Sequence, residues 1–173
     1  RLIDFVDGGN RAAEFAAYGL PWVEPVEARI EQLVEELELT LALWTQEGPV
    51  YYAGRFHRLE GALCTPRPVQ QPHPPIWLGE PNPAMLDAVA RYAQGWNSVP
   101  VTVAQMSARL LQLQAACDNV GRPYDEIEKS LEMQILIAPD LDGVRGKLRH
   151  MLALNPPPTV DPQMQAFLSG ATD

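Results

Sequence analysis

Three short stretches, at residues 7–10, 79–82 and 96–98, carry amide, carboxylate or hydroxyl side chains, and the first two also contain glycine and follow an apolar segment. Glycine lets a backbone approach a ligand closely, and N–H groups at the start of a helix bind phosphate. The sequence contains no nucleophile–base pair, metal-ligand spacing or P-loop. These residues therefore indicate a site that positions a cofactor, and the cofactor would carry the reactive chemistry.

The second stretch ends the segment PHPPIWLGE. Pro74 and Pro75 precede the apolar residues 76–78, where a proline costs no hydrogen bond of a sheet, and Gly79 ends the apolar run. Gly79 lets the backbone turn sharply into the helix that follows. The first N–H groups of that helix either hold a phosphate or only complete a tight turn, and the spacing leaves both alternatives open.

Short apolar strands and amphipathic helices alternate along the chain and must position these stretches. We expect strands at 2–6, 76–78, 95–100 and 131–137, and helices at 14–18, 26–44, 83–93, 102–120 and 144–154, followed by a tail. Such alternation predicts βαβ units and a parallel sheet. A doubly wound sheet and a section of a (β/α)8 barrel both fit, and in either fold ligands gather at the carboxyl ends of the strands.

The longest expected helix, at 26–44, carries an apolar stripe that includes Ile30, Leu33 and Leu37. Four glutamates lie mostly away from that stripe: Glu31, Glu35, Glu36 and Glu38. We interpret them as a solvated helix face rather than a metal site. The connection at 48–75 is irregular, and its apolar runs predict a small inserted hairpin.

Composition excludes several classes of protein. The chain has 173 residues and a formal net charge of −9, and it has no basic patch for a nucleic-acid backbone. No apolar run approaches the length of about 18 residues needed to span a membrane. Cys64 and Cys117 are too few for a disulfide framework, and we expect free thiols in a reducing cytosol. We therefore predict an acidic cytoplasmic protein without nucleic-acid or membrane partners.

Three segments occur in an order and spacing that resemble a known family: GGNRAAEFAAYGLP, the run from Arg29 to Glu80 that contains PPIWLGE, and ARYAQGWN. The sequence resembles the luciferase-like monooxygenases, which include flavin- and deazaflavin-dependent oxidoreductases. The resemblance is clear over about residues 1–100 and looser beyond them. It implies hydride transfer, or activation of O₂ at a reduced flavin, with FMN or coenzyme F420 at the carboxyl face of a (β/α)8 barrel.

The fold expected from this resemblance is α/β, a partial (β/α)8 barrel in which parallel strands alternate with helices. Residues 1–173 would form a single incomplete barrel domain of about four βα units with a small insertion near 48–75, since a whole barrel needs about 250 residues. A partial barrel leaves sheet edges and apolar helix faces unpaired. We therefore expect a homo-oligomer or a complementary fragment as partner.

The resemblance also assigns candidate cofactor-binding residues, which are Gly8, Gly9, Asn10, Gly79, Glu80, Asn82, Trp96 and Asn97. Asn10 would hydrogen-bond the cofactor ring or belong to an ordinary turn, and Trp96 suits core packing better than ring stacking. The loop at 79–83 departs from the family pattern, because Pro81 and Pro83 supply no N–H and Glu80 adds negative charge. The sequence identifies no catalytic residue and no metal ligand.

Two functions follow as alternatives. The first is part of a bacterial flavin- or F420-dependent oxidoreductase, of monooxygenase type, that acts on a small organic substrate. The second is a truncated or degenerate barrel without cofactor that serves as a structural or interaction protein. The prolines of the loop at 79–83 favour the second function, and the intact strand–loop pattern elsewhere favours the first.

Overall fold

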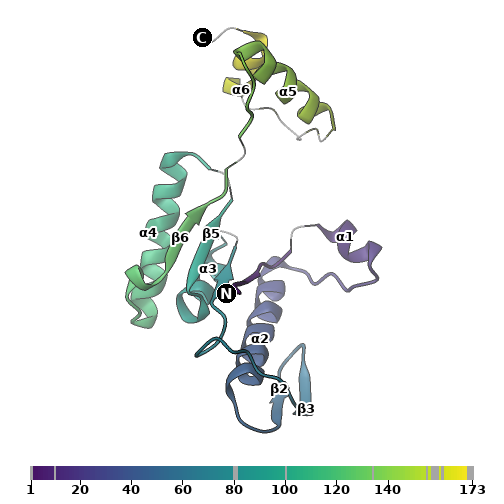
Figure 1. Cartoon of the computed structure of the whole chain (residues 1–173), viewed down its shortest axis with the longest axis vertical. Coiled ribbons are helices and arrows are strands. Elements are labelled where there is room, and N and C mark those ends of the chain that lie inside the picture. Colours follow the sequence, from purple (N-terminus) through teal and green to yellow (C-terminus); the bar gives the residue numbers. More distant parts are fainter. Residues whose placement is uncertain are drawn as a thin grey trace. The chain divides into compact units, whose positions relative to one another are not determined.

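The structure is a computed structural model that describes residues 2–9, 11–79, 82–99, 101–133, 135–154, 156, 160 and 162–170 (Figure 1). Its elements are β1 (Asp4–Val6), α1 (Ala12–Ala17), α2 (Val26–Thr45), β2 (Val50–Ala53), β3 (Arg58–Ala62), β4 (Ile76–Leu78), α3 (Pro83–Tyr92), β5 (Gly95–Ser98), α4 (Val103–Val120), the 3₁₀ turn η1 (Tyr124–Glu126), β6 (Glu128–Leu131), α5 (Leu141–Leu154) and α6 (Pro162–Ser169). The chain divides into two compact units, residues 1–132 and 133–173. That both belong to one barrel domain stays a prediction.

The main sheet has four parallel strands in the order β1-β4-β5-β6. Neighbouring strands follow one another in sequence once the β2–β3 hairpin is set aside. Residues of α2, α3 and α4 pack in one core against residues of β4 and β5. Because parallel crossovers are right-handed, a sheet that grows in one direction places its helices on one face, as in a barrel and unlike a doubly wound sheet. The partial barrel is therefore confirmed.

Burial alternates along β4 and β5 and separates the two faces of the sheet. Ile76, Leu78 and Trp96 are completely buried against the helices. Side chains on a strand alternate between faces, so Trp77 and Asn97 lie on the opposite face, which we call the open face. Phe5, the partner of Trp77 in the register of β1 and β4, is 51% exposed there.

Gly95 is required by the packing of the open face. In the register of β4 and β5 it stands beside Trp77, and a Cβ atom at Gly95 would collide with the indole ring of Trp77. The ring thus lies flat over the backbone of the neighbouring strand. This contact explains a glycine within a strand, where glycine otherwise costs conformational entropy.

The helix ends follow the sequence signals. Asn82 caps α3 through a hydrogen bond from the N–H of Ala84 to its Oδ1 at 2.9 Å, and Pro83 occupies the first turn. Thr102 and Gln105 form the expected capping box of α4, and Gly121 ends α4 with a φ of 69°. These caps fix the points at which the chain leaves one layer and enters the next.

The interpretation of the four glutamates as a solvated face is wrong for two of them. Glu35 accepts the backbone N–H groups of Phe56 at 2.9 Å and His57 at 3.0 Å, and also that of Arg55. Burial would raise the pKa of Glu35, but these hydrogen bonds outweigh it and lower the pKa. The side chain therefore anchors the turn of the β2–β3 hairpin to α2.

Glu38 forms the second anchor. Its two carboxylate oxygens accept the hydroxyl groups of Tyr52 at 3.0 Å and Tyr92 at 2.7 Å, so that one side chain of α2 holds both β2 and α3. Burial, followed by the hydrogen bond and the negative charge of Glu38, raises the pKa of both tyrosines to about 12. The inserted hairpin predicted from the sequence is confirmed and is fixed to the sheet layers through this carboxylate.

The strand expected at 131–137 is misplaced. The structure places β6 at Glu128–Leu131, where it pairs with β5, and Ile127 is buried just before it. Met133, Ile135 and Ile137 alternate as a strand would, but they are 67%, 72% and 76% exposed. Pairing with β5 and burial of Ile127 outweigh this local pattern. The expected tail also contains a further helix, α6.

Replacing Glu35 by glutamine is expected to lower the thermal unfolding midpoint at neutral pH and to flatten its dependence on pH. Because folding lowers the pKa of Glu35, the carboxylate stabilises the fold above its ordinary value of 4.5, and this stabilisation is lost as the pH falls below that value. Circular-dichroism melts between about pH 7 and about pH 3 measure it. Glu31→Gln is the control, since the Glu31–Arg55 pair is exposed, and equal effects of both variants would contradict the anchor.

Replacing Gly95 by alanine is expected to destabilise the chain by about 1–3 kcal/mol, because the added methyl group forces the Trp77 ring off the sheet. Urea denaturation gives the free energy of unfolding. Gly146→Ala in α5 serves as the control, because a Cβ atom there meets nothing within 4 Å. An unchanged stability of Gly95→Ala would show that the indole ring does not lie against this strand.

Candidate functional site

The candidate site is a row of residues at the carboxyl ends of four adjacent strands, on the open face of the sheet. Asn97 and Ser130 are partners in the register of β5 and β6, and Gly79 and Asp7 follow one residue beyond the paired ends of β4 and β1. We call Asp7, Gly79, Asn97 and Ser130 the carboxyl row. Phe5 and Trp77 lie one step below the row and form an aromatic floor.

Gly79 leaves the centre of the carboxyl row without a side chain. Its N–H donates to the carbonyl of Val6 at 3.2 Å, which continues the ladder between β1 and β4. A Cβ atom there would stand 3.2 Å from Cζ of Phe5 and 3.5 Å from Cβ of Asp7. A larger residue would fill the space above the aromatic floor, so glycine leaves room for a flat group at this edge.

Asn97 stands between Gly79 and Ser130 and is half-buried. The Ser130 hydroxyl lies 2.7 Å from the amide oxygen of Asn97. The sequence pattern predicted Asn97 but not Ser130, because the strand was expected at 131–137, beyond Ser130. The sequence signal that could have found Ser130 is the apolar Ile127, which the structure buries. A strand that starts directly after Ile127 alternates its side chains between the two faces and places Ser130 on the same face as Asn97.

The loop after β1 is held by Arg29 of α2, a residue that the sequence pattern does not predict in the site. Its Nε donates to the carbonyl of Gly8 at 3.2 Å, and its guanidinium lies 3.9 Å above the Trp22 ring. Asp7 accepts the N–H of Gly9 at 2.7 Å. A side chain at Gly9, which has a φ of 71°, would crowd the Phe15 ring. The loop is thus fixed in place beside the carboxyl row.

The start of α3 offers few donors to a phosphate. Pro83 has no N–H, and the N–H of Ala84 is used by the side chain of Asn82. Asn82 therefore caps its own helix through its amide oxygen. Among the described residues of this loop, the geometry favours the tight-turn alternative for Gly79 over a phosphate cradle.

The structure describes six of the eight predicted site residues, and one of these six, Asn82, caps α3. Gly79 and Asn97 belong to the carboxyl row, and Gly8 and Gly9 lie in the adjoining loop after β1. Trp96 is completely buried on the helix-covered face, which favours its core-packing alternative. Asn10 and Glu80 lie outside the described residues. The role of all eight residues in cofactor binding stays a prediction.

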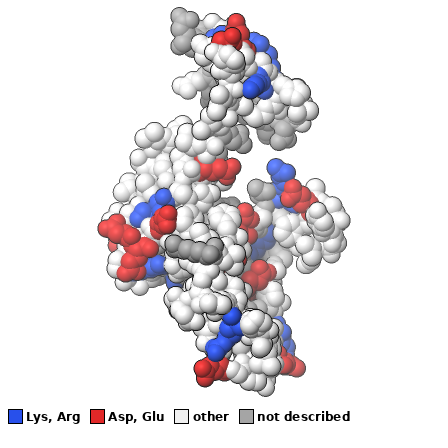
Figure 2. Space-filling model, in the orientation of Figure 1, with Lys and Arg blue, Asp and Glu red and all other residues white. Residues whose placement is uncertain are grey.

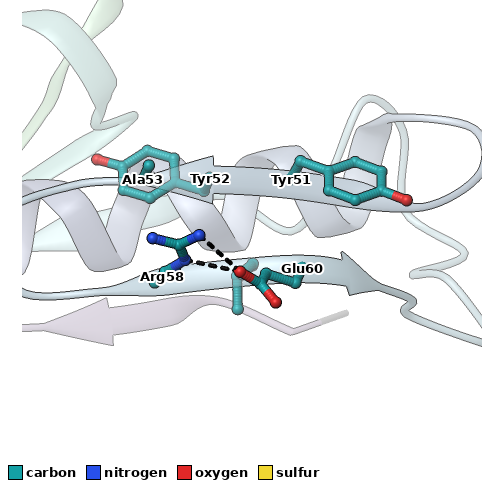
Figure 3. A pocket seen from close by; sticks show the side chains of 6 residues that line it. Tyr51, Tyr52, Ala53, Arg58 and Glu60 are labelled. Carbon is teal, nitrogen blue, oxygen red and sulfur yellow. Dashed lines mark hydrogen bonds and ion pairs between the residues drawn. The ribbon is translucent and has the colours of Figure 1, made fainter.

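Two hollows of the surface differ from the carboxyl row. A shallow depression of about 440 Å³ lies on the hairpin, where Figure 3 shows Tyr51 and Tyr52 along β2 and the Arg58–Glu60 pair on β3. None of the predicted site residues lines it. A smaller cavity of about 100 Å³ beside Asp7 and Gly8 is too small for a cofactor ring, which needs a pocket of about 300 Å³ or more.

Charge is distributed without a continuous basic surface on the face seen in Figure 2, where basic side chains lie beside acidic ones. Ion pairs of this kind join Arg11 to Glu14 and Arg58 to Glu60. In the part of the chain that the structure describes, no group of three His, Cys, Asp or Glu residues could hold a metal ion. No helix of that part is both long enough and apolar enough to cross a membrane.

Comparison with known proteins finds relatives that include FMNH2-dependent and F420-dependent enzymes. The chain is 28% identical over 163 residues to an FMNH2-dependent dimethylsulfone monooxygenase of Pseudomonas putida, which covers 84% of this chain and 43% of that protein. An F420-dependent secondary alcohol dehydrogenase, solved with an F420–acetone adduct, has a TM-score of 0.74 at 19% identity and covers 98% of this chain and 52% of its own. A monooxygenase from Streptomyces bottropensis has a TM-score of 0.69 at 24% identity, with coverages of 99% and 50%.

These structural likenesses show a shared fold, and the chain spans about half the length of the proteins it matches. The sequence profile of the luciferase-like monooxygenases matches residues 5–169, which is nearly the whole chain. The open face, the one-sided helix layer and this match agree with the resemblance found in the sequence. The chain belongs to the luciferase-like monooxygenase family.

Proposed function

We propose that this chain forms part of a flavin- or F420-dependent oxidoreductase and that its carboxyl row contacts the ring system of FMN or coenzyme F420. The observation that carries the proposal is the carboxyl row itself. Four adjacent parallel strands carry small or polar residues on the open face at their carboxyl ends, above an aromatic floor and at the edge where barrels bind their ligands. When bound, the cofactor would supply hydride transfer or oxygen activation on a small organic substrate.

The residues of the row suit a flat, polar heterocycle. Gly79 leaves space above Phe5, and Asn97 brings an amide to the same edge. Asn97 would hold the ring by a hydrogen bond, while Phe5 and Trp77 would exclude water from beneath it. The half-buried position of Asn97 strengthens such a hydrogen bond, because the local dielectric is lower than in water.

The phosphate end of the cofactor fits this chain less well than the ring does. The start of α3 lacks the N–H of Pro83, and the N–H of Ala84 is engaged by Asn82. Within this chain we therefore assign the ring contact to the carboxyl row and no phosphate contact to α3. Association with a second copy or with a complementary fragment remains part of the proposal, because the chain spans about half the length of its relatives.

The test is titration of the purified protein with FMN and with F420, followed by the change in cofactor fluorescence. Gly79→Val is expected to weaken binding at least about tenfold, because the branched side chain fills the space above Phe5. Tyr51→Ala is the matched variant at the competing hairpin depression and is expected to bind like the wild type. Circular dichroism checks that both variants keep the fold.

Two results would contradict the proposal. Loss of binding in Tyr51→Ala with normal binding in Gly79→Val would move the site to the hairpin. A wild-type chain that binds neither cofactor would favour a barrel that has lost its cofactor and serves as a structural or interaction protein. The engaged N–H of Ala84 is the observation that favours this second function.

A further inference from the structure

We propose that Ser130 is a positioning residue that orients the amide of Asn97, so that Asn97 presents an N–H donor to a ring carbonyl of the cofactor. This inference rests on the proposed function. It adds Ser130 to the site and states the direction of the hydrogen bond between Asn97 and the cofactor. It concerns the β6 end of the carboxyl row, to which the sequence pattern assigns no role.

The first step is the contact itself. Asn97 and Ser130 are register partners on neighbouring parallel strands, so their side chains leave the sheet on the same face. The Ser130 hydroxyl lies 2.7 Å from Oδ1 of Asn97 and 3.5 Å from the carbonyl of Trp96. A hydroxyl has one proton to donate, and the shorter contact is the better hydrogen bond.

The second step is the orientation of the amide. An asparagine amide has an acceptor end and a donor end, and an unrestrained side chain can exchange them by a flip. Donation from Ser130 to Oδ1 fixes the acceptor end toward β6, which turns Nδ2 toward the opposite side. The neighbour there is Gly79, which has no side chain to cover the nitrogen. The row thus offers a donor at its centre.

The third step is the chemistry of the acceptor. Among the described residues, the charged side chains on the open face of the four strands, at the carboxyl row and directly beyond it are Asp7, Glu128 and Glu132, and all three are acidic. Lys129 faces the other way, with its ammonium donating to the carbonyl of Tyr124 at 3.1 Å. A phosphate dianion would be repelled here, whereas a neutral carbonyl oxygen would accept the amide N–H. The ring systems of FMN and F420 share such carbonyl groups.

The oriented donor would also affect the reduction potential of the bound cofactor, a property that a merely structural serine would not control. Reduction adds electron density to the ring carbonyls, so an oriented N–H donor stabilises the reduced cofactor more than the oxidised one. Loss of the orientation should therefore lower the reduction potential of the bound cofactor. It should also weaken binding of the reduced form more than binding of the oxidised form.

The experiment compares Ser130→Ala with the wild type in binding of FMN and of riboflavin, or of F420 and its phosphate-free chromophore. Ser130→Ala is expected to raise the Kd by about three- to tenfold, by the same factor with and without the phosphate, and to lower the reduction potential. Ser130→Thr keeps the hydroxyl and is expected to restore both properties.

Ser98→Ala is the control. It removes a hydroxyl from the strand beside Ser130, but Ser98 is completely buried on the helix-covered face and accepts a hydrogen bond from Arg109 at 2.7 Å. Its loss should lower stability and leave the Kd and the potential of the folded protein unchanged. A shift in potential of equal size in Ser98→Ala would overturn the positioning role.

Three other outcomes also overturn the inference. An unchanged Kd and potential in Ser130→Ala would show that Ser130 does not orient Asn97 toward the ligand. An effect seen only with the phosphorylated cofactor would assign the donor to the phosphate. If the wild-type chain binds no cofactor, the proposed function fails first and this inference falls with it, a result distinguishable from a failure of Ser130 alone.

Discussion

The burial of one face of the sheet beneath α2, α3 and α4 is the constraint on which the rest of the structure depends. Side chains on a strand alternate between faces, so a residue whose side chain is buried in the core places the side chains of its two neighbours on the opposite face. Trp96 is completely buried between sheet and helices, and this fixes Asn97 on the open face. A shift of β5 by one residue would exchange these two side chains and remove the donor from the carboxyl row.

Much of the layer order was predictable because it depends on local signals. The apolar strand before Gly79, the proline at the start of α3 and the capping box of α4 each determine structure within a few residues, and all were confirmed. The position of β6 was not predictable in this way. Alternation continues through Ile135 and Ile137, and only pairing with β5 decides which part of the pattern joins the sheet.

The candidate site was predictable only where local signals determine the position of a residue. Gly79 follows β4 and Asn97 lies within β5, and both strands were expected at these positions, whereas Ser130 required the register between β5 and β6. Arg29 and Glu35 were beyond reach of the sequence, because each contacts a segment about 20 residues away in the chain: Arg29 holds Gly8, and Glu35 holds the turn at Phe56. An arginine or a glutamate on a helix carries no local mark of such a partner, and most are solvated.

Glu38 has a consequence for how the family can vary. One carboxylate satisfies hydroxyl groups from Tyr52 in the inserted hairpin and from Tyr92 in α3, which lies 54 residues from Glu38. A substitution at Glu38 leaves two tyrosines without their acceptor, while a substitution of either tyrosine leaves the carboxylate half satisfied. Relatives that lack the hairpin should therefore carry a different residue at the position of Glu38, so that the insertion and its anchor are gained or lost in evolution as a unit.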